Sequence, residues 1–488
     1  MKRQTKDLVE ERCAQLRTDF CHWEKTKDLV DQLLDIMLNY RQSGHPGGSR
    51  SKVHALLTTL LGGVMRWDIR HPEKPFGDRF VLGAGHVIPL VYATLAVLNE
   101  ALRIRHAQTG DDRYLVPNAS ERALYWEDLL GFRRRGGLSG HAEMEGKTLF
   151  LKFNTGPSGH GTPAAAGQAL ALKRAGAGDV KVFVFEGEGG LTPGGTHETM
   201  NSAWGMALDN LYFVIDWNDF GIDAHPVSSA VYGTPHDWFA SHGWRVLGTE
   251  HGNDWEPVAR TLLEMVLGNN PERQPNVAWV KTHKGRGYLK YDAPSHGVPH
   301  AMNSDIYWQT KRPFADKYGV RFVNQDQPAP SDPEALAAEF RANLEVVISV
   351  LRDDQALVDY LADRLVELGD SVPESLPTFR LGARGNPFED ARLTDYRSYP
   401  ADLFAAPGAS VANRAALGKW GAWVNAFGAR EYGRPLFMAC SADLAGSTQV
   451  AGFAEKYGDF PGYGWYERYG TAEGVLLPQE ITEFANAG

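Results

Sequence analysis

Cysteine is scarce in this chain of 488 residues, which contains three: Cys13, Cys21 and Cys440. Three scattered cysteines cannot build a disulfide framework or a zinc site, and they favour a reducing compartment. We therefore expect a cytoplasmic protein. The first residues, MKRQTKDLVEER, lack the apolar segment of a secretory signal. The apolar run at 55–65 is shorter than the ~20 residues of a membrane span, so no membrane association is expected.

An excess of positive charge is also missing. The net charge is −10, and a nucleic-acid binder would need a basic face to neutralise phosphates, so we expect no nucleic-acid partner. Apolar residues make up 43% and aromatic residues 11%, as in soluble globular proteins. The length exceeds that of one ordinary core and predicts at least two domains.

The apolar pattern predicts an α/β protein. Apolar periodicity predicts helices over 5–40, 52–65 and 163–174. The short β-rich runs VKVFVF and LYFVID predict buried parallel strands, with one helix between them at 197–207. Further strands are expected at 244–249 and 277–282. This order predicts an open, mostly parallel sheet flanked by helices over residues 1–310.

The pattern changes after residue 310. Proline and acidic residues cluster before a helical stretch, so 311–405 is interpreted as a linker with a helical insert. After residue 405 the α/β pattern restarts, with a helix expected at 411–427 and a strand at 435–440. We expect 406–488 to form a second, partial α/β domain.

Polar groups follow the two central predicted strands. Gly187-Glu188-Gly189 comes after the first strand, and Asn218 comes after the second, thirty positions beyond Glu188. Open α/β sheets bind ligands at the carboxyl ends of their strands. Glycines there let backbone N–H groups approach a phosphate, and the carboxylate can take a divalent cation. Both polar groups can therefore hold one cation that bridges a diphosphate.

This segment resembles the thiamine diphosphate motif of the transketolase family, a glycine-acid-glycine followed about thirty residues later by asparagine. Other segments stand in the same order as in that family, over roughly residues 30–310: SGHPG at 43–47, DRFVL with Gly85-His86, TGP at 155–157, KT with KG at 281–285, and SHG at 295–297. The resemblance implies thiamine diphosphate and Mg²⁺ (or Ca²⁺ or Mn²⁺), with metal ligands Glu188, Asn218 and the Phe220 carbonyl.

The resemblance also implies roles for residues outside this pair. Four histidines lie in glycine-flanked loops, which favour a surface cleft. The implied cofactor-binding residues are His86, His141, Gly156, Pro157, Gly187, Glu188, Gly189, Asn218 and Asp443. His45 and His296 match histidines that act on the substrate, since an imidazole can donate to a carbonyl oxygen or move protons near neutral pH.

The last hundred residues resemble the start of the family's pyrimidine-binding domain. Arg414 and Ser447 match residues that contact the substrate phosphate, and Glu483 matches the acid that protonates the pyrimidine ring. Two positions depart from the family: Glu188 replaces aspartate, and Pro193 replaces a glutamate that links paired sites. The resemblance implies that the rest of the pyrimidine domain and a third domain lie outside this sequence, so we expect either that a second chain supplies them or that the sequence is incomplete.

The resemblance implies transfer of a two-carbon ketol unit between sugar phosphates by a homodimer. Two alternatives stay open. One is the decarboxylating thiamine diphosphate component of a pyruvate dehydrogenase-type complex. The other is an inactive cofactor-binding or scaffolding subunit.

Overall fold

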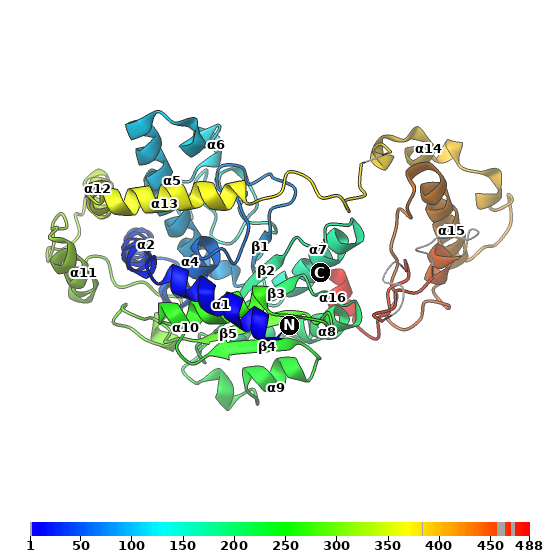
Figure 1. Cartoon of the computed structure of the whole chain (residues 1–488), viewed down its shortest axis with the longest axis horizontal. Helices are drawn as coiled ribbons and strands as arrows, with labels where there is room; N and C mark the ends of the chain where they lie inside the picture. Colours follow the sequence, from blue (N-terminus) through cyan, green and yellow to red (C-terminus); the bar gives the residue numbers. More distant parts are fainter. Residues whose placement is uncertain (1, 383, 456–463, 470–473) are drawn as a thin grey trace.

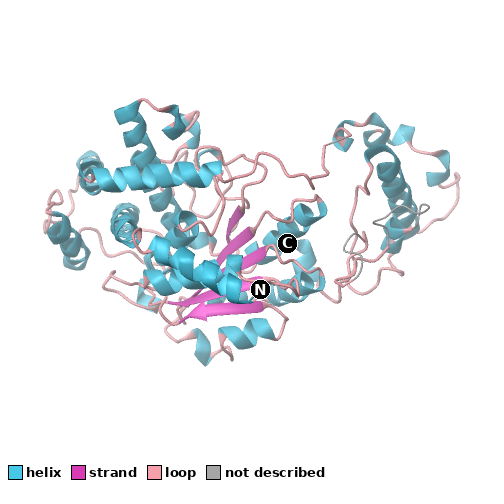
Figure 2. Cartoon of the chain, in the orientation of Figure 1, coloured by secondary structure: helices cyan, strands magenta, loops and turns pink. Residues whose placement is uncertain are grey.

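The computed structural model describes all residues except 1, 383, 456–463 and 470–473. A five-stranded sheet lies at the centre of the main body, with helices on both faces (Figures 1 and 2). All strand pairs are parallel, in the order β1-β2-β3-β5-β4. The strands are β1 (Arg79–Leu82), β2 (Val182–Gly187), β3 (Leu211–Trp217), β4 (Arg245–Thr249) and β5 (Asn276–Lys281). The predicted α/β fold is confirmed.

Alternate residues of the central strands enter two different cores. Phe183, Phe185 and Val214 belong to the larger core, whereas Val184 and Phe213 belong to the smaller one. Strands buried on both faces have nearly continuous apolar sequences, which is why these two runs are recognisable in the sequence.

Helices cover both faces of the sheet. The helices of the main body are α1 (Lys2–Leu16), α2 (Phe20–Arg41), α3 (Pro46–Ser51), α4 (Val53–Leu61), α5 (Ile88–Thr109), α6 (Ala119–Arg122), α7 (Gly161–Arg174), α8 (Gly194–Gly205), α9 (Pro235–Ala240), α10 (Trp255–Leu267), α11 (Asp305–Tyr318), α12 (Pro333–Asp353) and α13 (Gln355–Asp370). Helix α5 and the turn before it, Gly85–Thr109, are long and apolar enough to cross a membrane, but 89% of the most apolar window is buried in this body. Core packing accounts for that apolarity, and this run is longer than the one identified at 55–65.

Several predicted boundaries need correction. The helix expected over 5–40 is two helices, separated at residues 17–19, and the helix expected over 52–65 ends at Leu61. The expected linker begins with α11, α12 and α13, whose apolar side chains belong to the larger core. These helices bury amphipathic faces against α2 and α5, so the first body extends to about residue 372.

The remaining helices are α14 (Ala391–Thr394), α15 (Asn413–Tyr432) and α16 (Glu483–Ala487). Figure 1 shows α14 and α15 in a lobe to one side of the main body, while α16 returns to α8. The strand expected at 435–440, and with it the second, partial α/β domain expected over 406–488, is wrong: Ala439 makes an isolated bridge with Leu476, and the described part of 406–488 contains helices but no strand. A strand needs a continuous ladder with a neighbour, and this segment finds one bridge.

Candidate active site

The carboxyl edge of the sheet, where the parallel strands end, brings the two predicted polar groups together. Gly187 of β2 lies opposite Asp216 of β3, so Glu188 and Asn218 follow at neighbouring strand ends. The Asn218 backbone N–H donates to Oε2 of Glu188 over 3.2 Å. The thirty-residue spacing is therefore one strand–helix–strand crossover, with α8 as its helix.

The other carboxylate oxygen of Glu188 is a candidate metal ligand. Glu188 is 2% exposed, and its Oε1 has no hydrogen-bond partner among the described residues. Burial, followed by the negative charge of Asp216, raises the pKa of Glu188 to about 7. A bound cation would satisfy the orphaned oxygen and favour the ionised carboxylate.

The other two predicted metal ligands already have hydrogen-bond partners. Oδ1 of Asn218 accepts from the Phe220 N–H over 3.0 Å, and Nδ2 donates to Asp216. The Phe220 carbonyl accepts from Nζ of Lys284 over 2.5 Å, and the same ammonium reaches the Gly221 carbonyl at 2.9 Å. Glu188 and Asn218 fit a cation that prefers oxygen ligands. Among the described residues no cluster of three or more His, Cys, Asp or Glu forms a complete metal site, so such a cation would need further oxygens from its ligand.

Three of the predicted histidines form a cluster. The ring centroids of His45 and His86 are 4.8 Å apart, those of His45 and His296 5.3 Å, and those of His86 and His296 5.5 Å. They come from the start of α3, from the turn before α5 and from the loop after β5. Lys284 joins the cluster to the carboxyl edge, because its Nζ lies 2.8 Å from Nδ1 of His296.

Their surroundings hold these imidazoles in the neutral form. Burial, and then nearby positive groups, lowers the pKa of His45 to about 4 and that of His296 to about 3. Burial also lowers the pKa of His86 well below its ordinary value. A neutral imidazole has one donor and one acceptor nitrogen, so the cluster can orient hydroxyl or carbonyl groups.

The loop carrying Gly156 and Pro157 lies beside this cluster. Thr155 donates to the Leu82 carbonyl at the end of β1, and its N–H donates to the Ala142 carbonyl over 2.9 Å. A Cβ placed on Gly156 would lie 3.8 Å from the ring of His141. The loops bearing His141 and Gly156 therefore adjoin at this edge.

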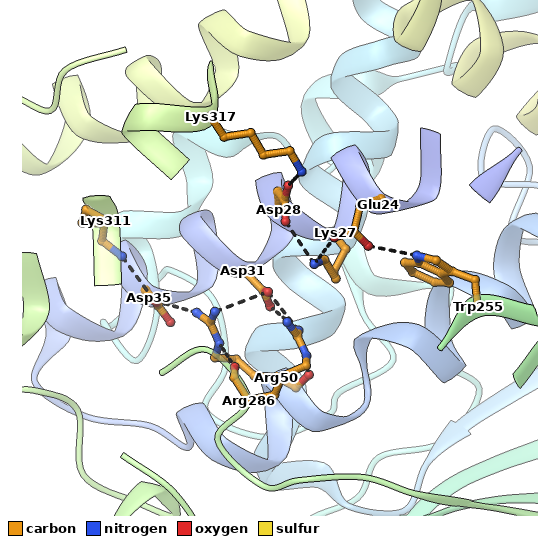
Figure 3. Close-up of polar contacts among 10 residues, drawn as sticks. All are labelled: Glu24, Lys27, Asp28, Asp31, Asp35, Arg50, Trp255, Arg286, Lys311 and Lys317. Carbon is orange, nitrogen blue, oxygen red and sulfur yellow. Dashed lines mark hydrogen bonds and ion pairs between the residues drawn. The ribbon is translucent and has the colours of Figure 1, made fainter. Parts of the chain in front are cut away.

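A buried ionic network joins α2, α3 and the loop after β5 (Figure 3). The Arg50 side chain donates to Asp35, Asp31 and the Arg286 carbonyl, at 2.7, 3.3 and 2.7 Å. Arg286 in turn donates to Asp31 and to the Arg50 carbonyl. These reciprocal bonds join α3, which follows His45, to the loop that carries His296. Lys311 of α11 also contacts Asp35, so the network ties both segments to α2.

Glu483 lies beside α8 and not on the loops that carry the histidine cluster. It begins α16, which packs on α8, where the Ala485 N–H donates to Glu198 over 2.8 Å. Glu483 and Phe484 line a cavity of about 560 Å³, together with Gly159, Pro193 and Gly195. The cavity thus adjoins the loops that follow Pro157 and Gly189.

Asp443, Arg414 and Ser447 are not brought to the carboxyl edge. All three are exposed or partly exposed and lie in the lobe around α15. Their predicted roles would require this lobe to approach a carboxyl edge, in the same chain or in another.

Two residues at the edge were missed by the sequence reasoning. Asp216, the last polar residue of β3, is buried and accepts from Ser51, Lys52, Asn218 and Thr282. Lys52 is buried beside it. The acidic residue at the end of an apolar strand was a usable signal for Asp216. No sequence pattern around Lys52 indicated that its ammonium points toward Asp216 at the carboxyl edge of the sheet.

Known proteins are similar to this chain in sequence and in fold. Residues 122–321 match the family "Transketolase, thiamine diphosphate binding domain". A transketolase of Halalkalibacterium halodurans is 27% identical over 428 residues, which cover 84% of this chain and 54% of that protein. One of the named subunits of the apulose-4-phosphate transketolase of Phocaeicola vulgatus is 29% identical over 273 residues, which cover 55% of this chain and 86% of that protein.

Solved structures give the same result for the fold. The transketolase of Campylobacter jejuni superposes with a TM-score of 0.62 at 22% identity, covering 95% of this chain and 61% of that one. The transketolase of Leishmania mexicana gives a TM-score of 0.61 at 21% identity over the same shares. The chain spans about half the length of the transketolases it matches first.

Proposed function

Because this chain belongs to the thiamine-diphosphate transketolase family, we propose that it takes part in the transfer of a two-carbon ketol unit between sugar phosphates. The observation that carries the proposal is the three-histidine cluster beside the Glu188–Asn218 edge. A polyhydroxylated substrate needs several neutral donors and acceptors close to one reacting carbon, and these imidazoles provide them.

The residues present fit the cofactor. Glycines 187 and 189 would let the backbone approach its diphosphate, and Glu188 and Asn218 would hold a divalent cation between the protein and the phosphates. Thiamine diphosphate, when bound, supplies the nucleophilic C2 carbon of its thiazolium ring. The protein's own part is to bind and orient: His45 and His296 would hold substrate oxygens, and Glu483 would hold a proton at the pyrimidine ring.

We further propose that the working enzyme is an assembly in a reducing compartment, with no membrane partner. The Phocaeicola vulgatus relative is by its name one part of a transketolase, which supports a second chain that completes this one. The positions of Arg414, Ser447 and Asp443 in the outlying lobe also support a dimer, in which the α15 lobe of one chain would serve the edge of another.

A donor comparison tests the proposed reaction. Purified chain, alone and with its candidate completing chain, is supplied with thiamine diphosphate, Mg²⁺, a ketose phosphate donor and an aldose phosphate acceptor. The proposal expects a product two carbons longer than the acceptor and no turnover of pyruvate. Pyruvate decarboxylation without ketol transfer would instead favour the pyruvate dehydrogenase-type alternative. Tight cofactor binding without turnover of either substrate would favour an inactive cofactor-binding protein.

A further inference from the structure

A second buried cation lies at the carboxyl edge in addition to Lys284. Lys52, between α3 and α4, has a side chain that is 5% exposed, and its Nζ donates to Oδ2 of Asp216 over 2.8 Å. Burying an ammonium is costly unless its charge is used in an ion pair or by a ligand. The pair with Asp216 accounts for one of its three N–H groups.

The ammonium of Lys52 lies close to Gly187, one of the two glycines of the predicted diphosphate cradle. A Cβ placed on Gly187 would lie 3.7 Å from Nζ of Lys52. A Cβ placed on Gly48 would lie 3.9 Å from the same Nζ and 4.0 Å from Nε2 of His86. The Lys52 ammonium therefore lies between Gly187 and Gly48, the glycine that adjoins His86 of the histidine cluster.

Asp216 does not occupy every N–H group of the Lys52 ammonium. The same carboxylate also accepts from Ser51, Thr282 and the Asn218 amide, so four donors share it. Among the described residues, Asp216 is the acceptor that the structure gives to Lys52. Two N–H groups of the ammonium are thus left for a ligand at this edge.

From this geometry, and on the basis of the proposed cofactor, we propose that Lys52 is a diphosphate-binding residue, whose ammonium donates to the diphosphate beside the divalent cation at Glu188 and Asn218. An ammonium is a compact point charge that suits phosphate oxygens. The built-in charge also means that part of the affinity for the diphosphate does not depend on the metal.

The test measures binding and needs no turnover. Lys52→Gln keeps a donor toward Asp216 but removes the charge, and Lys52→Met removes both. Thiamine diphosphate, inorganic pyrophosphate and unphosphorylated thiamine are titrated by calorimetry, with Mg²⁺ and with a chelator. Lys173→Gln is the matched control, because Lys173 pairs with Asp209 near the opposite edge of the same sheet. Thermal unfolding of each variant establishes that it is folded.

We expect Lys52→Gln to weaken the binding of thiamine diphosphate and of pyrophosphate at least tenfold, both with Mg²⁺ and with the chelator. Binding of thiamine should change less than twofold, and Lys173→Gln should bind like wild type. Unchanged affinity of a folded Lys52→Gln for both phosphate ligands would overturn the inference while leaving the proposed function intact. Equal losses for thiamine and its diphosphate would also overturn it, since they would indicate a structural role. A wild-type protein that binds neither phosphate ligand would overturn the inference and the proposed function together.

Discussion

At the scale of single residues, the histidine cluster makes a prediction about acid stability. The ordinary pKa of histidine is about 6.5, whereas burial lowers the pKa of His45 to about 4 and that of His296 to about 3. Between these values the unfolded chain binds more protons than the folded one. Stability supplied by the neutral imidazoles is therefore complete above pH 6.5 and is lost as the pH falls toward 4 and 3.

Replacing both histidines by asparagine should flatten this dependence. The measurement is the denaturant midpoint of the apoprotein at steps between pH 7 and 4, for wild type and for His45→Asn/His296→Asn. The exposed His225→Asn is the control and should follow wild type. An unchanged slope in the double variant would show that other groups govern the acid response.

Some residues of the site could be predicted from the sequence and others could not. Glu188, Asn218, His45, His86 and His296 were predictable because glycine-flanked loops and strand ends mark them, and the structure brings them to one edge. Lys52 and the reciprocal Arg50–Arg286 bonds were not, because they depend on which side chain a short helix turns inward. That orientation is set by tertiary packing and has no local sequence signature.

At the scale of elements, the ionic network in Figure 3 fixes α3 against the loop after β5. We predict that Arg50→Leu lowers the free energy of unfolding by about 3–5 kcal/mol, because it leaves the buried carboxylates of Asp31 and Asp35 without this partner. Denaturant unfolding measures the change.

A separate, more exposed ion pair between α11 and α2 is the control. Lys317 contacts Asp28 but its side chain is 48% exposed, so Lys317→Ala should cost less than about 1 kcal/mol. A cost for Arg50→Leu as small as that of Lys317→Ala would contradict the role given to this network.

Some helices and strands could be predicted from the sequence, and others could not. Strands β2 and β3 were predictable because both faces are buried and their sequences are continuously apolar. Strand β1 has four residues and begins with Arg79. An apolar run this short does not distinguish a strand from a loop or a helix. The break at residues 17–19 contains no glycine or proline that would mark it in the sequence. The segment at 435–440 has the composition of a strand, but it makes one isolated bridge instead of a ladder.

At the scale of the whole molecule, the lobe and the returning segment expose large apolar side chains. They include Phe437, Leu444, Trp465, Tyr469 and Phe484. Exposed apolar groups gathered in one part of a chain indicate an interaction surface. We predict a twofold dimer, with or without a completing chain, that buries well over ~2,000 Å².

Light scattering with and without thiamine diphosphate measures this assembly. The double variant Leu444→Ser/Tyr469→Ser should raise the protein concentration at which half of the chains are dimeric by at least tenfold. Tyr232→Ser, which replaces a 95% exposed tyrosine of the main body, should not. A wild-type monomer in both conditions that still binds the cofactor tightly would mean that the site lies within one chain.

The central claim is that the edge formed by Glu188 and Asn218 binds thiamine diphosphate through a divalent cation. Its most direct test is calorimetric titration of thiamine diphosphate into wild type and Glu188→Ala, with Mg²⁺ and with a chelator. The control is Glu250→Ala, an exposed carboxylate just after β4. We predict saturable binding by wild type and by Glu250→Ala that weakens without metal. We predict that Glu188→Ala weakens the binding of thiamine diphosphate in Mg²⁺ at least tenfold, which corresponds to about 1.4 kcal/mol. Equal affinity of wild type and Glu188→Ala in Mg²⁺ would contradict the account.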